Sequence, residues 1–124
     1  MAHLLLVADD LWVKNDVAAA VTDPGTVLES IDEPEEAAEV LGGQRYDAAI
    51  VDMQVGSMGG MAITRLLRDA MAAGDVEETP IILLLDRNAD TFLARRAGAD
   101  AYVVKPFTSQ QLRMALTTFD PAGA

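Results

Sequence analysis

The stretch Leu4-Leu5-Leu6-Val7-Ala8-Asp9-Asp10 (residues 4–10) joins five apolar side chains directly to two carboxylates. A continuous apolar run of this kind is typical of a strand buried on both faces, as in parallel α/β sheets, whereas a one-sided sheet would show alternation. Further runs with strand character cover residues 26–31, 48–51, 81–85 and 101–104. The run at 26–31 contains Glu29 and Ser30, so we expect it at an edge of the sheet.

Segments with helical character separate these strands. They cover residues 11–21, 35–41, 61–72, 89–97 and 109–117, so strands and helices alternate along the chain. Strands joined by single helices pair in parallel, and their crossovers are almost always right-handed. The sequence therefore predicts an α/β fold, a doubly wound five-stranded parallel sheet with helices on both faces.

The length and the composition suit one compact domain. The chain has 124 residues, of which 51% are apolar, and this is enough for one core and too little for two. We expect a single domain over residues 1–124, with its core at about 3–118 and a short tail at 119–124. No effector domain is expected after it.

Charge and cysteine content exclude several classes of function. The net charge is −11 and the Lys and Arg residues are scattered, which argues against nucleic-acid and anionic-membrane partners. The lack of cysteine excludes disulfides, thiolate catalysis and zinc–sulfur sites. No apolar run approaches the roughly 20 residues that cross a bilayer, and the N-terminus has no signal-peptide pattern, so we expect a cytoplasmic protein.

Charged residues follow the strands at the edge of the sheet where ligands bind in such folds. That edge is formed by the carboxyl ends of the strands, where the winding direction reverses. Asp9 and Asp10 follow the first run, Asp52 the third, Asp86 the fourth and Lys105 the fifth. Two carboxylates about 4 Å apart repel by roughly 4 kcal/mol at an effective dielectric of about 20, so this set requires a cation or bound protons.

The pattern favours Mg²⁺ as that cation. Magnesium prefers octahedral oxygen coordination and is typically held by one or two carboxylates, waters and a phosphate oxygen. Asp10 and Asp52 can supply the carboxylates and the backbone carbonyl of Gln54 a further ligand, while Asp9 can hold a metal-bound water.

Lys105 adds a compact positive charge to this acidic edge. It is suited to neutralise a carboxylate or a transferred phosphoryl group, and Pro106 restrains the turn that follows it. Each residue alone is explained as a solvated charge in an acidic chain, but the set as a whole favours a site.

A magnesium-dependent hydrolase of the haloacid dehalogenase type is an alternative class of function. Such an enzyme would require a second aspartate two residues after Asp52, and Gln54 stands there.

Four pieces of sequence carry a family resemblance. They are Asp9-Asp10 after the first strand, YDAAIVD at residues 46–52, Gly60 at the start of the next helix, and AGADAYVVKPF at residues 97–107. Through them the chain, from about Leu4 to Leu116, resembles the receiver domains of two-component response regulators. For the fold, the resemblance implies the flavodoxin-like strand order 2-1-3-4-5.

The resemblance also implies a role for each site residue. Asp52 would accept a phosphoryl group from a phosphohistidine of a sensor histidine kinase or a phosphotransfer protein. Magnesium would be held by Asp10, Asp52 and the Gln54 carbonyl, with Asp9 acting through water, and Lys105 would pair with the phosphoryl oxygens. The protein would then be a phosphoryl acceptor rather than an enzyme, beyond self-catalysed phosphorylation and dephosphorylation.

Departures from the family pattern concern the conformational switch. The family places Ser or Thr at the end of the fourth strand, and its hydroxyl moves toward the phosphoryl group while the fifth-strand aromatic, here Tyr102, turns inward. Leu85 stands at that position and cannot hydrogen-bond a phosphoryl oxygen. Asp86 follows where a small residue is usual, and its negative charge should disfavour the phosphorylated state. Gly56 replaces a customary proline.

Two hypotheses of function stay open. The first is a stand-alone receiver domain in two-component signal transduction that accepts a phosphoryl group on Asp52 and switches in an atypical or impaired way because of Leu85. The second is a phosphorylation-independent protein–protein interaction module with a receiver fold, motivated by Leu85 and Asp86. The sequence names neither the kinase nor the downstream protein target, and it leaves a homodimer open.

Overall fold

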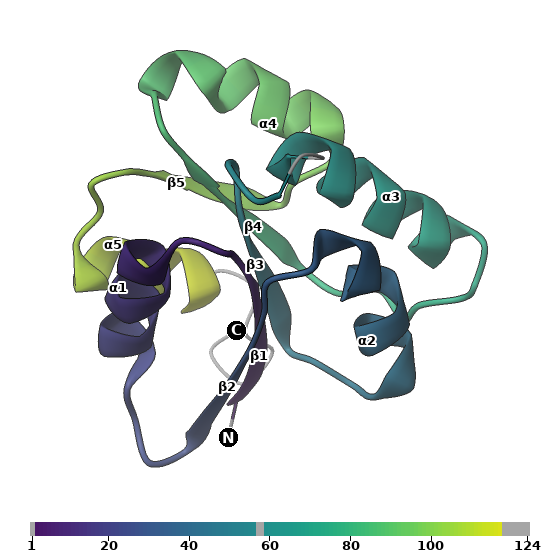
Figure 1. Cartoon of the computed structure of the whole chain (residues 1–124), viewed down its shortest axis with the longest axis horizontal. Coiled ribbons are helices and arrows are strands. Elements are labelled where there is room, and N and C mark those ends of the chain that lie inside the picture. The colour runs from purple at the N-terminus through teal and green to yellow at the C-terminus, as the bar shows by residue number, and fades with distance from the viewer. Residues whose placement is uncertain (1, 57–58, 118–124) are drawn as a thin grey trace.

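Five parallel strands form one sheet in the order β2-β1-β3-β4-β5 in a computed structural model of the chain, which describes residues 2–56 and 59–117 (Figure 1). The strands are β1 (Ala2–Val7), β2 (Thr26–Ile31), β3 (Ala48–Asp52), β4 (Ile81–Leu85) and β5 (Ala101–Val104). The predicted strand order and parallel pairing are confirmed, and β2 lies at an edge as expected.

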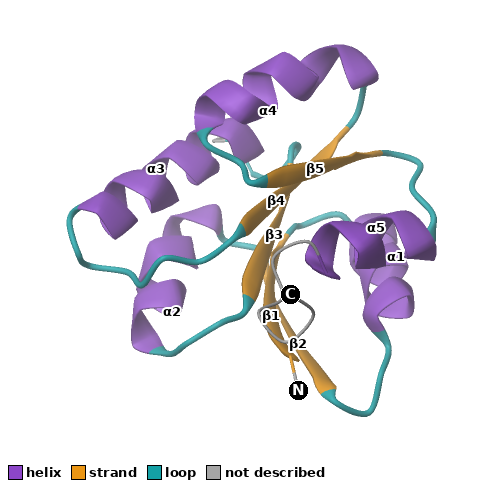
Figure 2. Cartoon of the chain, turned by 180° about the vertical axis from the view of Figure 1, so that it is seen from behind, coloured by secondary structure: helices purple, strands orange, loops and turns teal. Residues whose placement is uncertain are grey.

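Helices cover both faces of the sheet. They are α1 (Leu11–Val21), α2 (Ala37–Gly43), α3 (Gly60–Ala72), α4 (Thr91–Ala97) and α5 (Ser109–Thr117). Helices α1 and α5 lie on one face, and α2, α3 and α4 lie on the other (Figures 1 and 2). Among the helices in the part of the chain that the structure describes, none is long and apolar enough to cross a membrane.

The element boundaries differ from the predicted ones by a few residues. Strand β1 begins at Ala2 and ends before Ala8. Tight 3₁₀ turns, η1 (Pro34–Glu36) and η2 (Asn88–Asp90), precede α2 and α4, where the sequence predicted α-helix from residues 35 and 89. Such turns are frequent at helix starts, and a proline without an N–H suits the first turn. The predicted tail at 119–124 lies outside the described residues.

Successive residues of the central strands face opposite helix layers, which is why these strands are apolar throughout. Leu5 of β1 belongs to the apolar cluster beneath α2, α3 and α4, together with Leu67. Its neighbour Leu6 belongs to the cluster beneath α1 and α5, together with Val17 and Leu112. Asp52, the buried last residue of β3, and the charged residues that follow β1, β4 and β5 lie at the carboxyl edge of the sheet.

Candidate functional site

Asp52, Asp86 and Lys105 meet at the carboxyl edge of three neighbouring strands. The register pairs Leu85 of β4 with Val104 of β5. The residues that follow, Asp86 and Lys105, therefore leave the sheet side by side. The Lys105 Nζ donates a hydrogen bond to Asp52 Oδ1 at 2.6 Å and lies 2.9 Å from Asp86 Oδ1. One ammonium group is thus shared by two carboxylates.

The three charges differ in burial. The side chain of Asp52 is 1% exposed, that of Lys105 is 22% exposed and that of Asp86 is 28% exposed. Burial lowers the pKa of Lys105, but the hydrogen bonds with Asp52 and Asp86 outweigh it, so this pKa is raised above its ordinary value. A buried carboxylate is costly unless it is paired, and Lys105 supplies that partner to Asp52.

Asp9 and Asp10 lie in the loop that follows β1, and a backbone amide engages each of them. Asp10 is the N-cap of α1, where its Oδ1 accepts a hydrogen bond from the Trp12 N–H at 2.8 Å. Such a cap stabilises a helix by about 1 kcal/mol. Asp9 Oδ2 accepts a hydrogen bond from the Gly56 N–H at 2.9 Å. The loops after β1 and β3 are therefore tied together at this edge.

The donor atoms at this edge are of the kind that Mg²⁺ prefers. Asp10 and Asp52 offer carboxylate oxygens, and Gln54 lies in the turn after β3, where its N–H donates to Asp52 Oδ1 at 3.4 Å. Within residues 2–56 and 59–117, no three acidic or histidine side chains form a ready-made metal cluster. Magnesium is commonly held by only one or two carboxylates, so the donor set fits it in chemistry. The ligand roles stay predictions.

Leu85 and Tyr102, the two residues predicted to affect switching, belong to one apolar region. Leu85 is fully buried in the cluster beneath α2, α3 and α4, and Tyr102 packs half-buried against the same cluster. The guanidinium carbon of Arg95 lies 5.9 Å from the centre of the Tyr102 ring, within the range of a cation–π contact. The end of β4 therefore presents only a hydrocarbon side chain at the position where the sequence resemblance leads one to expect a hydroxyl. Pro106 follows Lys105 through a cis peptide bond.

Gly56 and Gly60 shape the loop after β3, a contribution that sequence analysis did not assign. Gly56 has a φ of 57°, and a Cβ added there would lie 2.8 Å from Pro34 Cγ. A Cβ on Gly60 would overlap the Asp52 carbonyl oxygen and lie 2.8 Å from Met53 Cα. Helix α3 therefore begins directly against the backbone of Asp52. The available signal was the presence of glycine in a predicted strand-to-helix turn.

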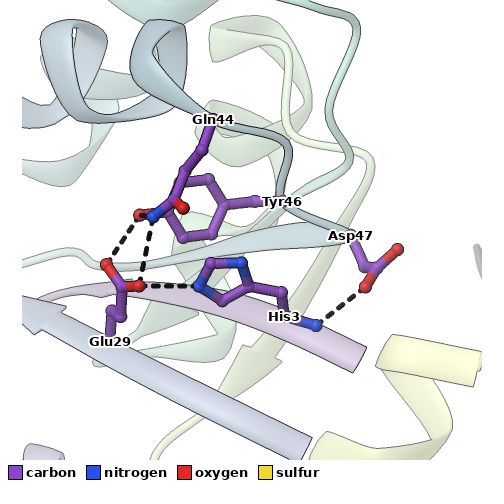
Figure 3. Close-up of polar contacts among 5 residues, drawn as sticks. All are labelled: His3, Glu29, Gln44, Tyr46 and Asp47. Atoms are coloured by element: carbon purple, nitrogen blue, oxygen red, sulfur yellow. Dashed lines mark hydrogen bonds and ion pairs between the residues drawn. The ribbon is translucent and has the colours of Figure 1, made fainter. Parts of the chain in front are cut away.

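A second polar cluster lies toward the amino ends of β1 and β3 (Figure 3). Glu29 Oε1 lies 2.7 Å from His3 Nε2 and accepts a hydrogen bond from Gln44 at 3.1 Å. The Tyr46 hydroxyl donates to Glu29 Oε2 at 2.8 Å, and the rings of Tyr46 and His3 are 4.3 Å apart. The His3 N–H donates to Asp47 Oδ2 at 2.7 Å. Strand pairing alone brings these residues together, so their spacing gave no signal.

The same contacts shift two pKa values in opposite directions. Hydrogen bonds with Tyr46 and then with His3 hold the pKa of Glu29 below its ordinary value. Burial raises the pKa of the Tyr46 phenol, the Gln44 hydrogen bond opposes that rise and Glu29 adds to it. This cluster lies at the other end of the strands from Asp52. We regard it as a structural cluster whose side-chain contacts hold β1, β2 and the segment before β3 together.

Comparison with known sequences shows the family of the chain. Its model, described as the response regulator receiver domain, matches residues 4–117. The two-component response regulator PhoP of Pseudomonas aeruginosa is 30% identical over 115 residues, which cover 91% of this chain and 49% of PhoP. The chain therefore spans about half the length of this curated relative.

Solved structures agree with the fold. The receiver domain of the sensor histidine kinase PA1611 from Pseudomonas aeruginosa, solved with a magnesium ion in its active-site cleft, matches with a TM-score of 0.80 at 25% identity. The match covers 95% of this chain and 96% of that domain. The chemotaxis protein CheY4 of Vibrio cholerae matches with a TM-score of 0.81 at 24% identity, over 97% of this chain and 99% of that one. The latter similarity concerns the fold alone.

Proposed function

Because this chain belongs to the response regulator receiver domain family, we propose that it accepts a phosphoryl group on Asp52 in two-component signalling. The donor would be a phosphohistidine of a sensor histidine kinase or of a phosphotransfer protein. The observation that carries this proposal is the buried Asp52 carboxylate, held 2.6 Å from the Lys105 ammonium at the carboxyl edge of the sheet. Receiver domains are typically not classical enzymes, and this one would serve as an acceptor.

In the transfer, a carboxylate oxygen of Asp52 forms a bond to phosphorus while the P–N bond of the donor breaks. The electron pair of that bond stays on the imidazole nitrogen, which takes up a proton from solvent. Phosphoryl transfer depends mainly on positioning and on charge neutralisation, and a carboxylate is a competent covalent acceptor. Lys105, whose raised pKa keeps it protonated at neutral pH, would pair with the phosphoryl oxygens.

We assign the cation site to Asp10, Asp52 and the Gln54 carbonyl, with Asp9 acting through a water molecule. The oxygen character of these donors supports Mg²⁺, as does the magnesium ion in the related PA1611 receiver domain. When bound, Mg²⁺ supplies positive charge that neutralises the phosphoryl oxygens. Asp52 would then serve both the cation and the transferred group.

The direct test is to incubate the protein with MgCl₂ and acetyl phosphate and to measure the intact mass. The wild type should gain one phosphoryl group, and the isosteric variant Asp52→Asn should gain none because an amide is not a competent acceptor. Asp69→Asn, an exposed substitution on α3 with the same change in net charge, should behave as the wild type. A wild-type protein that gains no phosphoryl group would contradict the proposal.

A phosphorylation-independent interaction module is the second candidate, favoured by the end of β4. Leu85 is fully buried there and offers no hydroxyl to a phosphoryl group, and Asp86 already engages Lys105. A receiver fold with these residues would bind a partner protein constitutively rather than in response to phosphorylation.

Amide exchange around Tyr102, with and without acetyl phosphate, separates the candidates. A change in exchange on phosphorylation would support a receiver that switches. A phosphoryl adduct without such a change would support an acceptor that lacks the usual switch, and no adduct at all would leave the interaction module.

A further inference from the structure

We propose that Asp86 is a built-in competitor for Lys105, so that phosphorylation of Asp52 is slowed by a carboxylate of the protein itself. This inference rests on the proposed function of Asp52 and concerns the regulation of that site. Asp86 is a positioning residue rather than a catalytic one, because its main effect on the phosphoryl group is exerted through the Lys105 ammonium.

The contact between Asp86 and Lys105 follows from the sheet. Leu85 and Val104 are paired in register, and the Lys105 N–H donates to the Leu85 carbonyl oxygen at 2.7 Å. This backbone hydrogen bond holds β4 and β5 together at the point where the Asp86 and Lys105 side chains leave the sheet. The paired backbones therefore fix where the two side chains begin, and Lys105 Nζ lies 2.9 Å from Asp86 Oδ1.

The ammonium group has a limited capacity. It carries three N–H donors, and Asp52 and Asp86 already engage it at 2.6 and 2.9 Å. A phosphoryl group carries about −1.5 to −2 charges and presents three acceptor oxygens, which take hydrogen-bond donors or a cation as partners. One N–H donor is left for that group, so a second hydrogen bond from Lys105 to the phosphoryl oxygens would require Lys105 to leave Asp86 or Asp52.

Asp86 also acts directly as a like charge. Its carboxylate is 28% exposed, so solvent screens it only in part. An incoming anionic donor that comes close to the Lys105 ammonium also comes close to the Asp86 charge, because the two groups are 2.9 Å apart. Both effects have the same sign, since each disfavours the arrival of a phosphoryl group at Asp52.

The opposite role is also physically reasonable and gives the opposite result. If Asp86 served mainly to hold Lys105 in place, its removal would loosen the ammonium and would slow phosphorylation. The sign of the effect of an Asp86 substitution therefore decides between a competitor and a support.

The experiment measures the initial rate of adduct formation by intact mass, with MgCl₂ and acetyl phosphate as the probe. In this reaction an Asp52 oxygen bonds to phosphorus, the P–O bond of the donor breaks, and acetate leaves with the electron pair. Asp86→Asn keeps the shape and removes the charge, and Asp86→Ala removes the side chain, in case one variant fails to fold. We expect both to react about three- to tenfold faster than the wild type.

The control for net charge is Asp69→Asn, which should react at the wild-type rate. Asp69 lies nine residues beyond Gly60 along α3, which corresponds to about 13.5 Å of helix between these two residues. A second readout is the dependence of the reaction rates on ionic strength, because an effect of packing alone would not depend on the salt concentration. The ratio of the Asp86→Asn rate to the wild-type rate should fall toward one as the salt concentration rises from about 0.05 to about 0.5 M.

Each outcome has one meaning. Equal or slower rates in both Asp86 variants would overturn the competitor role and leave the acceptor role of Asp52 intact. An adduct on the Asp86 variants and none on the wild type would support the competitor role of Asp86 but would overturn the proposal that the chain with its own Asp86 accepts a phosphoryl group. No adduct on any variant would overturn the acceptor role and, with it, this inference.

Discussion

Leu85 places a fully buried hydrocarbon side chain at the end of β4, beside the strand that carries Tyr102. Leu85→Thr should supply a hydroxyl for a phosphoryl oxygen, but it should also lose packing and bury a polar group. We expect the free energy of unfolding to fall by about 2–4 kcal/mol, measured by chemical denaturation. Phosphorylation of this variant should change amide exchange near Tyr102.

Leu85→Val is the matched control, because valine has the shape of threonine without the hydroxyl. It should lose part of the packing and gain no response to phosphorylation. The difference between the two variants isolates the hydroxyl from the change in volume. If the valine variant responds as the threonine variant does, the hydroxyl is not the missing element of the switch.

At the scale of single residues, the sequence could place charges at an edge but could not assign their partners. Strand order alone brings Asp52 and Lys105 together, because β4 is the only strand between theirs. The sharing of Lys105 with Asp86 also depends on the exact register of β4 and β5. The bond between Asp9 and the Gly56 amide depends on a loop conformation, and nothing in the pattern of side chains encodes it.

The start of α3 is built against the backbone of Asp52, and this makes Gly60 a sensitive position. Alanine is about 1 kcal/mol better than glycine inside a helix. At Gly60, however, the new Cβ would overlap the Asp52 carbonyl oxygen, and neither backbone segment can move freely. We expect Gly60→Ala to reduce the free energy of unfolding by about 1–3 kcal/mol and to reduce phosphorylation of Asp52.

Gly43→Ala is the control for that prediction. Gly43 ends α2, and a Cβ added there would meet no atom within 4 Å. This substitution should leave the free energy of unfolding unchanged or raise it by up to about 1 kcal/mol. Thermal or chemical unfolding of the two variants side by side checks the comparison, and equal effects would contradict the close approach at Gly60.

Strand β2 illustrates what sequence patterns predict for an element and what they miss. Glu29 and Ser30 interrupt its apolar character, and this correctly indicated an edge strand. The pattern could not indicate that Glu29 turns toward His3 and Tyr46, because these partners lie on other elements (Figure 3). The type of an element follows from local composition, whereas its side-chain contacts with other elements follow from long-range pairing.

The stability of the whole molecule should depend on pH at both extremes. The pKa values of Tyr46 and Lys105 are raised in the folded protein, so their stabilisation is present below about pH 10 and is lost as the pH rises through the folded values. The pKa of Glu29 is lowered, so its stabilisation is present above about pH 4.5 and is lost as the pH falls. Urea denaturation at a series of pH values should show a plateau between these limits.

Single substitutions identify the two limbs of that profile. Tyr46→Phe should make the alkaline loss shallower, because the phenol no longer titrates, and should also make the acid limb shallower, because its hydroxyl is the main hydrogen-bond partner that lowers the pKa of Glu29. Glu29→Gln should flatten the acid limb. A profile in which both variants keep the wild-type slopes would assign the pH dependence to other groups.

At the scale of the whole molecule, the fold was the most predictable property. Alternating apolar strands and helices determine a parallel sheet with two helix layers, and the observed core follows that arrangement. The starts of α2 and α4 were less predictable, because a 3₁₀ turn and an α-turn place similar residues on the same face. The functional roles of the residues were the least predictable from the sequence, because they depend on distances of a few ångströms between particular side chains.

Trp12 gives the protein an intrinsic fluorescence close in sequence to Asp10. It is the single tryptophan of the chain, the residue is 78% exposed, and its backbone N–H donates to the Asp10 carboxylate. The emission of an indole ring depends on the charge and the hydration around it. Two residues after Asp10 the protein therefore carries an intrinsic fluorophore, whose emission can be followed during phosphorylation without any attached label.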